Sequence, residues 1–208
     1  MYKSLHGACK MKDGHVKILL LGSAATGKSC ILHKYYGKRY EPYPTIGVEV
    51  TSNMLVKKNQ QVCLRFYDMG GARCWWWWIP THIRHTDLVF LFYDVTRPET
   101  LSEAGEILQG LHKHRNKFRV ILVGNKTDKE EERQVSIFDA NTFLQEMKSK
   151  GWMLNHIETN VDNITAFVRI LKKIIFGIKS HRTFSKMVFA DEVIDNRPNW
   201  SKYLFNWQ

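Results

Sequence analysis

The sequence predicts an α/β fold: a mostly parallel six-stranded sheet with one antiparallel edge strand and helices on both faces. Apolar runs that suit buried strands alternate with stretches whose apolar residues recur at helical spacing. Two of the runs alternate apolar and polar residues on either side of a short polar turn, as a hairpin does. With 208 residues, 44% of them apolar, the chain is long enough for one good core and short for two.

The positions of these runs give the elements in order. Strands are expected at 16–21, 48–56, 62–66, 88–93, 120–123 and 153–157. Helices are expected at 28–36, 101–111, 137–147 and 164–178. Residues 37–45 contain two prolines and no apolar period, which indicates an irregular segment. In such a sheet the ligand binds at the carboxyl ends of the strands.

The two ends of the chain fall outside this pattern. Residues 1–15 are polar and are interpreted as an N-terminal extension, residues 16–178 as the domain, and residues 179–208 as a tail. The tail opens with a basic cluster and is rich in aromatic residues, so we expect it to dock on the domain or on a partner.

Charge and cysteine content narrow the class of protein. Lys and Arg outnumber Asp and Glu 31 to 20, a formal net charge of +11, which favours nucleotides, nucleic acid or anionic membranes as partners. The four cysteines show neither C-x-x-C pairing nor a disulfide framework, so we expect free thiols and a cytoplasmic protein. The sequence has no apolar run of about 20 residues, the length that a transmembrane helix needs.

The first strand runs into a glycine-bounded loop. Gly22 and Gly27-Lys28-Ser29 have the G-x-x-x-x-G-K-[ST] spacing, which surrounds a phosphate chain with backbone N–H groups, a helix N-terminus and one ammonium. Lys28 would neutralise the β- and γ-phosphates, and the Ser29 hydroxyl would ligate Mg²⁺. Alone, this loop fits a kinase, an ATPase or a GTPase.

Two further polar motifs lie at strand ends. Asp68 follows the second hairpin strand, where it would face the phosphate loop, and Asn125-Lys126-Thr127-Asp128 follows the strand at 120–123. A carboxylate such as that of Asp128 accepts from both the ring N–H and the exocyclic amine of guanine, whereas adenine offers no such pair of donors. The motif therefore favours GTP over ATP.

Together these segments resemble the small GTPases of the Ras superfamily, and within it the Rab group, from about residue 16 to residue 178. The matching segments are Gly-Lys-Ser-Cys at 27–30, Pro-Thr-Ile-Gly-Val-Glu at 44–49, Tyr-Asp-Val-Thr at 93–96, Val-Gly-Asn-Lys-Thr-Asp at 123–128 and Ile-Glu-Thr at 157–159. The resemblance implies a P-loop NTPase fold, the small G domain. It also implies a GTP-binding switch in vesicle and protein transport that uses Mg²⁺ and acts through effector and regulatory proteins.

The resemblance assigns roles to individual residues. It implies nucleotide contacts for Gly22, Ser23, Ala24, Ala25, Thr26, Gly27, Lys28, Ser29, Cys30, Thr45, Gly71, Asn125, Lys126, Asp128, Thr159 and Asn160. It implies Mg²⁺ ligands in Ser29, Thr45 and Asp68, the last through water, and a stacking contact between Tyr40 and guanine. Ala25 stands where the family usually has glycine; if its φ is positive, it carries a strain of about 1 kcal/mol.

The chain departs from the family at the position that serves hydrolysis. The family places a Gln, which orients the attacking water, directly after the Asp-x-x-Gly segment, and this chain has Ala72 there. A methyl group cannot hydrogen-bond a water, and the neighbouring Arg73 is no evident replacement. Two interpretations stay open: a switch that hydrolyses GTP slowly, and a GTP-bound interaction module that does not hydrolyse it. No catalytic residue is assigned.

Four consecutive tryptophans, Trp75, Trp76, Trp77 and Trp78, lie in the second switch region. Either two of them pack inward and the others have no role, or the run is a surface for effector and regulatory proteins. Four consecutive residues cannot all face one way, so we expect some indole area to be exposed.

Membrane and nucleic-acid partners receive less support. The chain ends in Phe205-Asn206-Trp207-Gln208 and its last cysteine is Cys74, so we expect no prenylation. A basic tail contributes about 1 kcal/mol per Lys or Arg near an anionic surface, which gives at most a weak, salt-sensitive association with endomembranes. The basic cluster at 112–115 comes without a recognition pattern, so no nucleic acid is expected.

Overall fold

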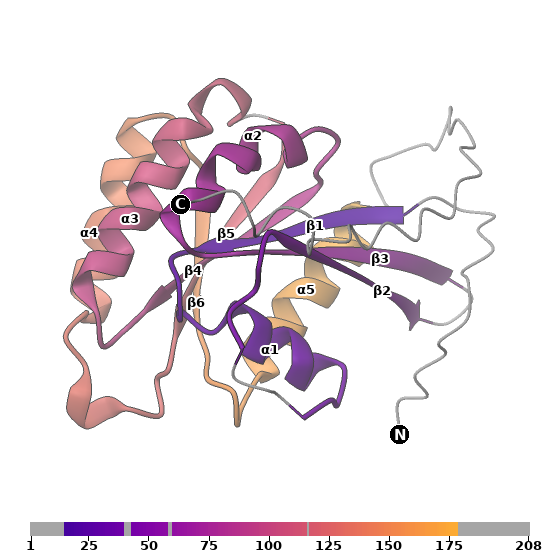
Figure 1. The fold of residues 1–208 in the computed structure, drawn as a ribbon, viewed down its shortest axis with the longest axis horizontal. Helices are drawn as coiled ribbons and strands as arrows, with labels where there is room; N and C mark the ends of the chain where they lie inside the picture. Colours follow the sequence, from indigo (N-terminus) through magenta and orange to yellow (C-terminus); the bar gives the residue numbers. More distant parts are fainter. Residues whose placement is uncertain (1–14, 40–42, 58–59, 116, 179–208) are drawn as a thin grey trace, which may run out of the picture.

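A six-stranded sheet runs through the middle of the computed structural model, which describes residues 15–39, 43–57, 60–115 and 117–178 (Figure 1). The strands are β1 (His15–Gly22), β2 (Val48–Lys57), β3 (Gln60–Met69), β4 (Leu88–Asp94), β5 (Arg119–Asn125) and β6 (Leu154–Glu158). Their order in the sheet is β2-β3-β1-β4-β5-β6, and β2 pairs antiparallel with β3 while the other neighbours are parallel. The predicted sheet and its antiparallel edge strand are confirmed.

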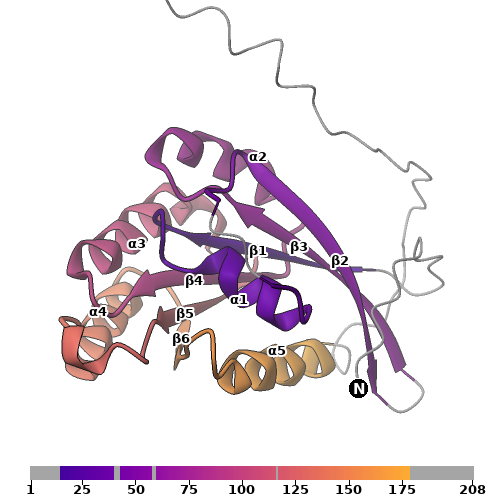
Figure 2. The same ribbon diagram turned by 60° about the horizontal axis from the view of Figure 1, so that its bottom comes forward.

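Helices cover both faces of this sheet. They are α1 (Lys28–Tyr35), α2 (Ile79–His82), α3 (Pro98–Gly110), α4 (Ile137–Ser149) and α5 (Thr165–Ile178), with 3₁₀ turns η1 (Arg73–Trp78), η2 (His112–His114) and η3 (Glu130–Glu132). Figures 1 and 2 show α1 and α5 on one face and α2, α3 and α4 on the other. The four predicted helices are present, whereas η1 and α2 were not predicted.

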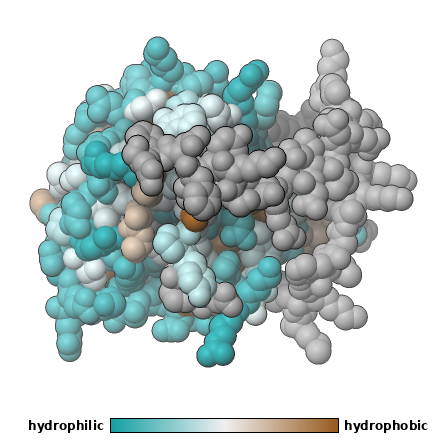
Figure 3. Space-filling view, in the orientation of Figure 1, coloured by the Kyte–Doolittle hydropathy of each residue, from teal (hydrophilic) through white to brown (hydrophobic). Residues whose placement is uncertain are grey.

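The two faces have separate cores because successive strand residues point to opposite sides of the sheet. In β1, Leu19 and Leu21 pack on the side of α3 and α4, whereas Ile18 and Leu20 pack on the side of α1 and α5. All four are at most 1% exposed. Over the described residues, the outer surface in Figure 3 is mostly hydrophilic, as this division requires.

The structure tests the expectations about cysteines and membrane helices for the described residues only. Cys30, Cys63 and Cys74 form no disulfide, as expected. Cys9, Tyr40, almost all of the N-terminal extension and the whole tail lie outside the described residues. Among the helices that the structure describes, none is long and apolar enough to cross a bilayer.

The start of α4 is fixed by a capping box. The Ser136 hydroxyl accepts from the Asp139 backbone N–H at 3.2 Å, and the Asp139 carboxylate accepts from the Ser136 backbone N–H at 2.8 Å. These bonds satisfy N–H groups that have no partner within a helix.

We predict that Ser136→Ala lowers the free energy of unfolding by about 1 kcal/mol, because it removes the cap. Urea denaturation followed by circular dichroism measures the change. Thr142→Ala, at an exposed position within the same helix, is the control and should change stability by less than about 0.5 kcal/mol. Equal losses in the two variants would contradict a role for the cap.

Candidate nucleotide-binding site

The phosphate loop joins β1 to α1 and requires glycine at both ends. Gly22 has a φ of 135°, and a Cβ added there would lie 2.3 Å from the carbonyl oxygen of Phe92. Gly27 has a φ of 90°, and its Cβ would lie 2.1 Å from Asn125 Nδ2. Backbone conformation and lack of space therefore both exclude larger residues. Between the two, Ala25 has a φ of 59°, the strained conformation anticipated for it.

Lys28 lies under this loop. Its ammonium donates to the carbonyls of Gly22 at 2.9 Å and Ser23 at 2.8 Å, and the residue is 5% exposed. Burial lowers the pKa of Lys28 to about 8, an effect that the nearby Asp68 carboxylate partly offsets. A phosphate beside the ammonium would favour its charged form. The surroundings of Lys28 therefore suit a phosphate-neutralising role.

Three oxygen-bearing side chains from separate segments meet beside Lys28. Ser29 Oγ lies 2.9 Å from Thr45 Oγ1 and donates to Asp68 Oδ2 at 2.5 Å. Asp68 is 1% exposed, and its other oxygen, Oδ1, has no hydrogen-bond partner among the described residues. Burial raises the pKa of this carboxyl. A buried, unsatisfied carboxylate oxygen beside two hydroxyls fits Mg²⁺, which prefers oxygen ligands.

Switch I (residues 43–47) and switch II (residues 70–78) lie against each other and against the phosphate loop. The Gly70 backbone N–H donates to the Gly47 carbonyl at 2.8 Å. A Cβ on Gly71 would lie 2.5 Å from the Ala24 backbone nitrogen. The Gly71 backbone is thus held at the loop, where contact with the γ-phosphate is expected of it.

The residues that follow Gly71 do not offer a group to a water at this site. Ala72 is exposed and precedes η1. The Arg73 guanidinium pairs with Glu103 at 3.2 Å and Glu106 at 3.0 Å, both on α3. Glu103 also accepts from the Ser23 hydroxyl of the phosphate loop. Ion pairs this exposed contribute little to stability, but they direct Arg73 toward α3.

The Trp segment (Trp75–Trp78) divides into packed and exposed rings. A Cβ on Gly70 would lie 2.7 Å from Trp75 Cδ1, and one on Gly47 would lie 3.1 Å from Trp78 Cζ3. These two indoles therefore cover the contact between the switches. Trp77 is 66% exposed, so the expectation of exposed indole area is confirmed.

Residues 125–128, which we call the base loop, begin at the end of β5. Their first residue, Asn125, connects this loop to the phosphate loop. It is fully buried, and its Nδ2 donates to the Thr26 carbonyl at 2.8 Å. The next residue, Lys126, pairs with the buried Asp94 carboxylate at 2.6 Å. Burial alone would raise the pKa of Asp94, but bonds from Lys126 and Thr96 lower it below its usual value.

Sequence reasoning gave no role to Asp94 or to Arg97. Arg97 donates to Asp94 through Nε at 3.1 Å and to the Ala24 carbonyl of the phosphate loop through Nη2 at 2.9 Å. Asp94 therefore links Lys126 and Arg97, and Arg97 reaches the phosphate loop. The role of Asp94 could have been inferred from its position at the end of a strand. No pattern in the sequence marks Arg97.

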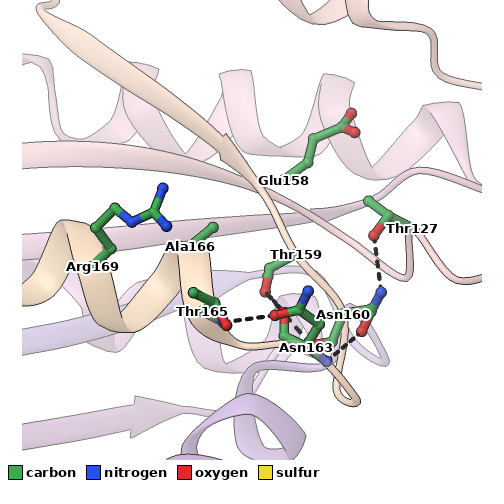
Figure 4. A pocket seen from close by; sticks show the side chains of 8 residues that line it. All are labelled: Thr127, Glu158, Thr159, Asn160, Asn163, Thr165, Ala166 and Arg169. Atoms are coloured by element: carbon green, nitrogen blue, oxygen red, sulfur yellow. Dashed lines mark hydrogen bonds between the residues drawn. The ribbon is translucent and has the colours of Figure 1, made fainter.

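The loops expected at the base are also joined to each other. Asn160 Nδ2 donates to Thr127 Oγ1 at 3.2 Å, and the Thr159 hydroxyl donates to the Asn163 carbonyl at 3.0 Å. Figure 4 shows this polar cluster beside a pocket of about 280 Å³ between the end of β6 and the first turns of α5. Asp128 is exposed next to Thr127. The segments expected to hold a base, residues 125–128 and 159–160, therefore lie together, and Asn125 connects them to the phosphate loop.

Fold and site together define a P-loop nucleotide-binding protein with a guanine-type base loop. The chain belongs to the Ras family, whose model matches residues 17–187. "Ras-related protein Rab-4A" of Danio rerio is 32% identical over 171 residues, which cover 79% of this chain and 78% of that protein. The resemblance to Rab-like small GTPases is therefore confirmed, and it supports a GTP-binding switch. Proteins of this family generally bind GTP or GDP together with Mg²⁺.

We predict that Ala25→Gly raises the free energy of unfolding by up to about 1 kcal/mol, because glycine adopts a φ of 59° without strain. Ala24, the adjacent and equally exposed alanine, does not have a positive φ. Ala24→Gly is therefore the matched control, and it should lower stability by about 0.5–1 kcal/mol. Urea denaturation of both variants tests the pair, and a loss of stability in Ala25→Gly would refute strain at this residue.

Proposed function

We propose that this chain is a Rab-like switch that holds GTP with Mg²⁺, hydrolyses it slowly and acts in intracellular vesicle transport. The observation that carries the proposal is the meeting of Ser29, Thr45 and the unsatisfied Asp68 oxygen beside Lys28. Residues 16–178 are the GTPase domain in this proposal, with residues 1–15 as an extension and residues 179–208 as a tail.

Each part of the site has one task in this proposal. The loop amides and Lys28 bind the phosphate chain, and Ser29, Thr45 and Asp68 would hold Mg²⁺, which neutralises charge on the phosphate oxygens. Asn125 fixes the phosphate loop through its hydrogen bond to the Thr26 carbonyl, and the Asp128 carboxylate selects guanine. Thr159 and Asn160 position the base loop through their hydrogen bonds to Thr127.

Slow hydrolysis follows from the residues after Gly71. Ala72 has no polar atom in its side chain, and the Arg73 guanidinium is directed to Glu103 and Glu106. The attacking water would therefore lack an orienting partner from switch II, although the γ-phosphate is still bound.

A second candidate is an interaction module that stays bound to GTP and never hydrolyses it. The exposed Trp77 favours this candidate, since a large, rigid aromatic ring is typical of binding hot spots. In both candidates, effector and regulatory proteins would contact the switches through the Trp segment. The two differ only in whether bound GTP turns over at all.

We predict that Ala72→Gln accelerates single-turnover hydrolysis of preloaded GTP by about tenfold or more, the effect of one added transition-state hydrogen bond. Arg73→Gln is the control: it introduces the same side chain one position later and should give no acceleration. Wild-type single-turnover hydrolysis at a rate that is ordinary for the family would refute slow turnover. An Ala72→Gln variant that is no faster would place the defect elsewhere in the site.

We predict that Asp128→Ala weakens GTP binding by about a hundredfold, since two hydrogen bonds to a charged group are lost. Binding of ATP, which lacks the paired donors, should not change. Glu131→Ala removes an exposed carboxylate three residues further on and should leave both affinities as they are. Fluorescent nucleotide titration measures all three proteins, and equal affinity of Asp128→Ala and wild type for GTP would exclude base recognition by this carboxylate.

A further inference from the structure

The end of the molecule away from the nucleotide site is strongly basic. Three loops meet there, at the amino ends of β4, β5 and β6: residues 84–87, residues 112–115 with 117–119, and residues 148–153. We call these loops the basic end. Their exposed Lys and Arg residues are Arg84, Lys113, Lys117, Arg119, Lys148 and Lys150. The acidic residue within the loops is Asp87, which is half-buried and accepts from the Lys17 backbone N–H at 3.0 Å.

The three loops form one continuous surface. The Arg119 backbone N–H donates to the Asp87 carbonyl at 3.1 Å, which joins the first loop to the second. A Cβ on Gly151 would lie 3.1 Å from Arg115 Nε, which joins the second loop to the third. The Lys150 ammonium pairs with Glu146 of α4 at 2.6 Å, and the other exposed cations of this surface form no ion pair with the described part of the chain.

Charge is distributed unequally along the strand direction. At the carboxyl ends of the strands, next to the nucleotide site, η3 consists of Glu130, Glu131 and Glu132, all exposed. Lys129 pairs with Glu132 at 2.8 Å and Arg133 with Glu130 at 2.9 Å, so a negatively charged plane would attract the basic end more strongly than the η3 end. Such a plane would therefore orient the molecule with its switches pointing away.

One of the three loops also exposes an apolar residue. Met153 is 90% exposed, although it is flanked by Trp152, which is 2% exposed. Trp152 packs on Phe118, with ring centroids 6.2 Å apart. The Phe and Trp rings of these loops thus pack on each other, which leaves only the smaller imidazoles of His85 and His112 as exposed rings among the described residues, while a flexible thioether faces outward.

We propose that the basic end is a docking surface for an anionic lipid bilayer, with Met153 entering the interfacial layer and the switches left free for other proteins. Lipid headgroups supply the extended plane of negative charge, and the acyl boundary accepts the methionine side chain. A single-stranded nucleic acid would use exposed Phe, Tyr or Trp rings as stacking platforms, and no described residue of the basic end is an exposed Phe, Tyr or Trp. This surface is separate from the nucleotide site, so the inference does not depend on GTP binding or hydrolysis.

Flotation of the full chain with vesicles tests the proposal. We expect wild type to bind vesicles of 30% phosphatidylserine and 70% phosphatidylcholine at 0.1 M KCl, and to be released at 0.5 M KCl. The double variant Lys113→Gln/Lys117→Gln should bind about 30-fold more weakly, roughly fivefold for each lysine. Lys34→Gln/Lys38→Gln removes two positive charges from the end of α1, on the other face of the sheet, and should bind like wild type.

Met153→Ser separates a bilayer from another polyanion. It should weaken vesicle binding about threefold at every salt concentration, because the apolar contribution is not screened. The proposal is overturned if Lys113→Gln/Lys117→Gln floats like wild type, if both double variants lose binding equally, or if pure phosphatidylcholine vesicles bind as well. It is also overturned if a 20-nucleotide poly(U) RNA binds more tightly than the vesicles and Met153→Ser leaves vesicle binding unchanged.

Discussion

The hydrogen bond from Asn125 to the Thr26 carbonyl holds the nucleotide site together. It joins two loops that are 99 residues apart in the chain, and it does so inside the protein, where a lost partner costs more than it does in water. Gly27 lies so close to Asn125 Nδ2 that no side chain fits between them. The phosphate loop is therefore positioned by the end of β5 as much as by the strand that precedes it. Because Asn125 also precedes Lys126 and Asp128, one residue sets the spacing between the phosphate and base ends of the site.

Binding and hydrolysis depend on different residues in this molecule. Among the groups suited to hold phosphate and Mg²⁺, Lys28 and Asp68 are buried and Ser29 and Thr45 are part-buried beside them, and the loop glycines cannot be replaced without displacing neighbouring atoms. In contrast, the position suited to orient a water carries the exposed Ala72, and the next residue forms ion pairs with α3. The packed indoles of Trp75 and Trp78 hold switch II against switch I. This division between the two sets of residues is the basis of our proposal that the chain retains GTP and hydrolyses it slowly.

The sequence predicted those parts of the structure that repeat a local pattern. The buried runs around Leu20 and Leu91 and the helical spacing from Leu101 to Leu111 gave the sheet and helices, because each residue's burial depends on its near neighbours. The strained Ala25 was also anticipated, because the family that the sequence resembles usually has glycine at this position. The turn η1 was missed because four consecutive tryptophans show no apolar periodicity. Its conformation depends instead on the packing of Trp75 on Gly70 and of Trp78 on Gly47. The role of Arg97 was missed because its bond to the Ala24 carbonyl arises only when two distant segments meet.

The nucleotide carried by the purified full chain is the most direct test of this account. Protein isolated in the presence of Mg²⁺ would be denatured and the released nucleotide identified and quantified by anion-exchange chromatography. The account predicts GTP, close to one per chain, because the site selects guanine and lacks a group that orients the attacking water. Recovery of ATP would contradict the assignment of the base loop. Recovery of GDP alone would contradict slow hydrolysis, and an empty chain that takes up no added GTP would contradict the site itself.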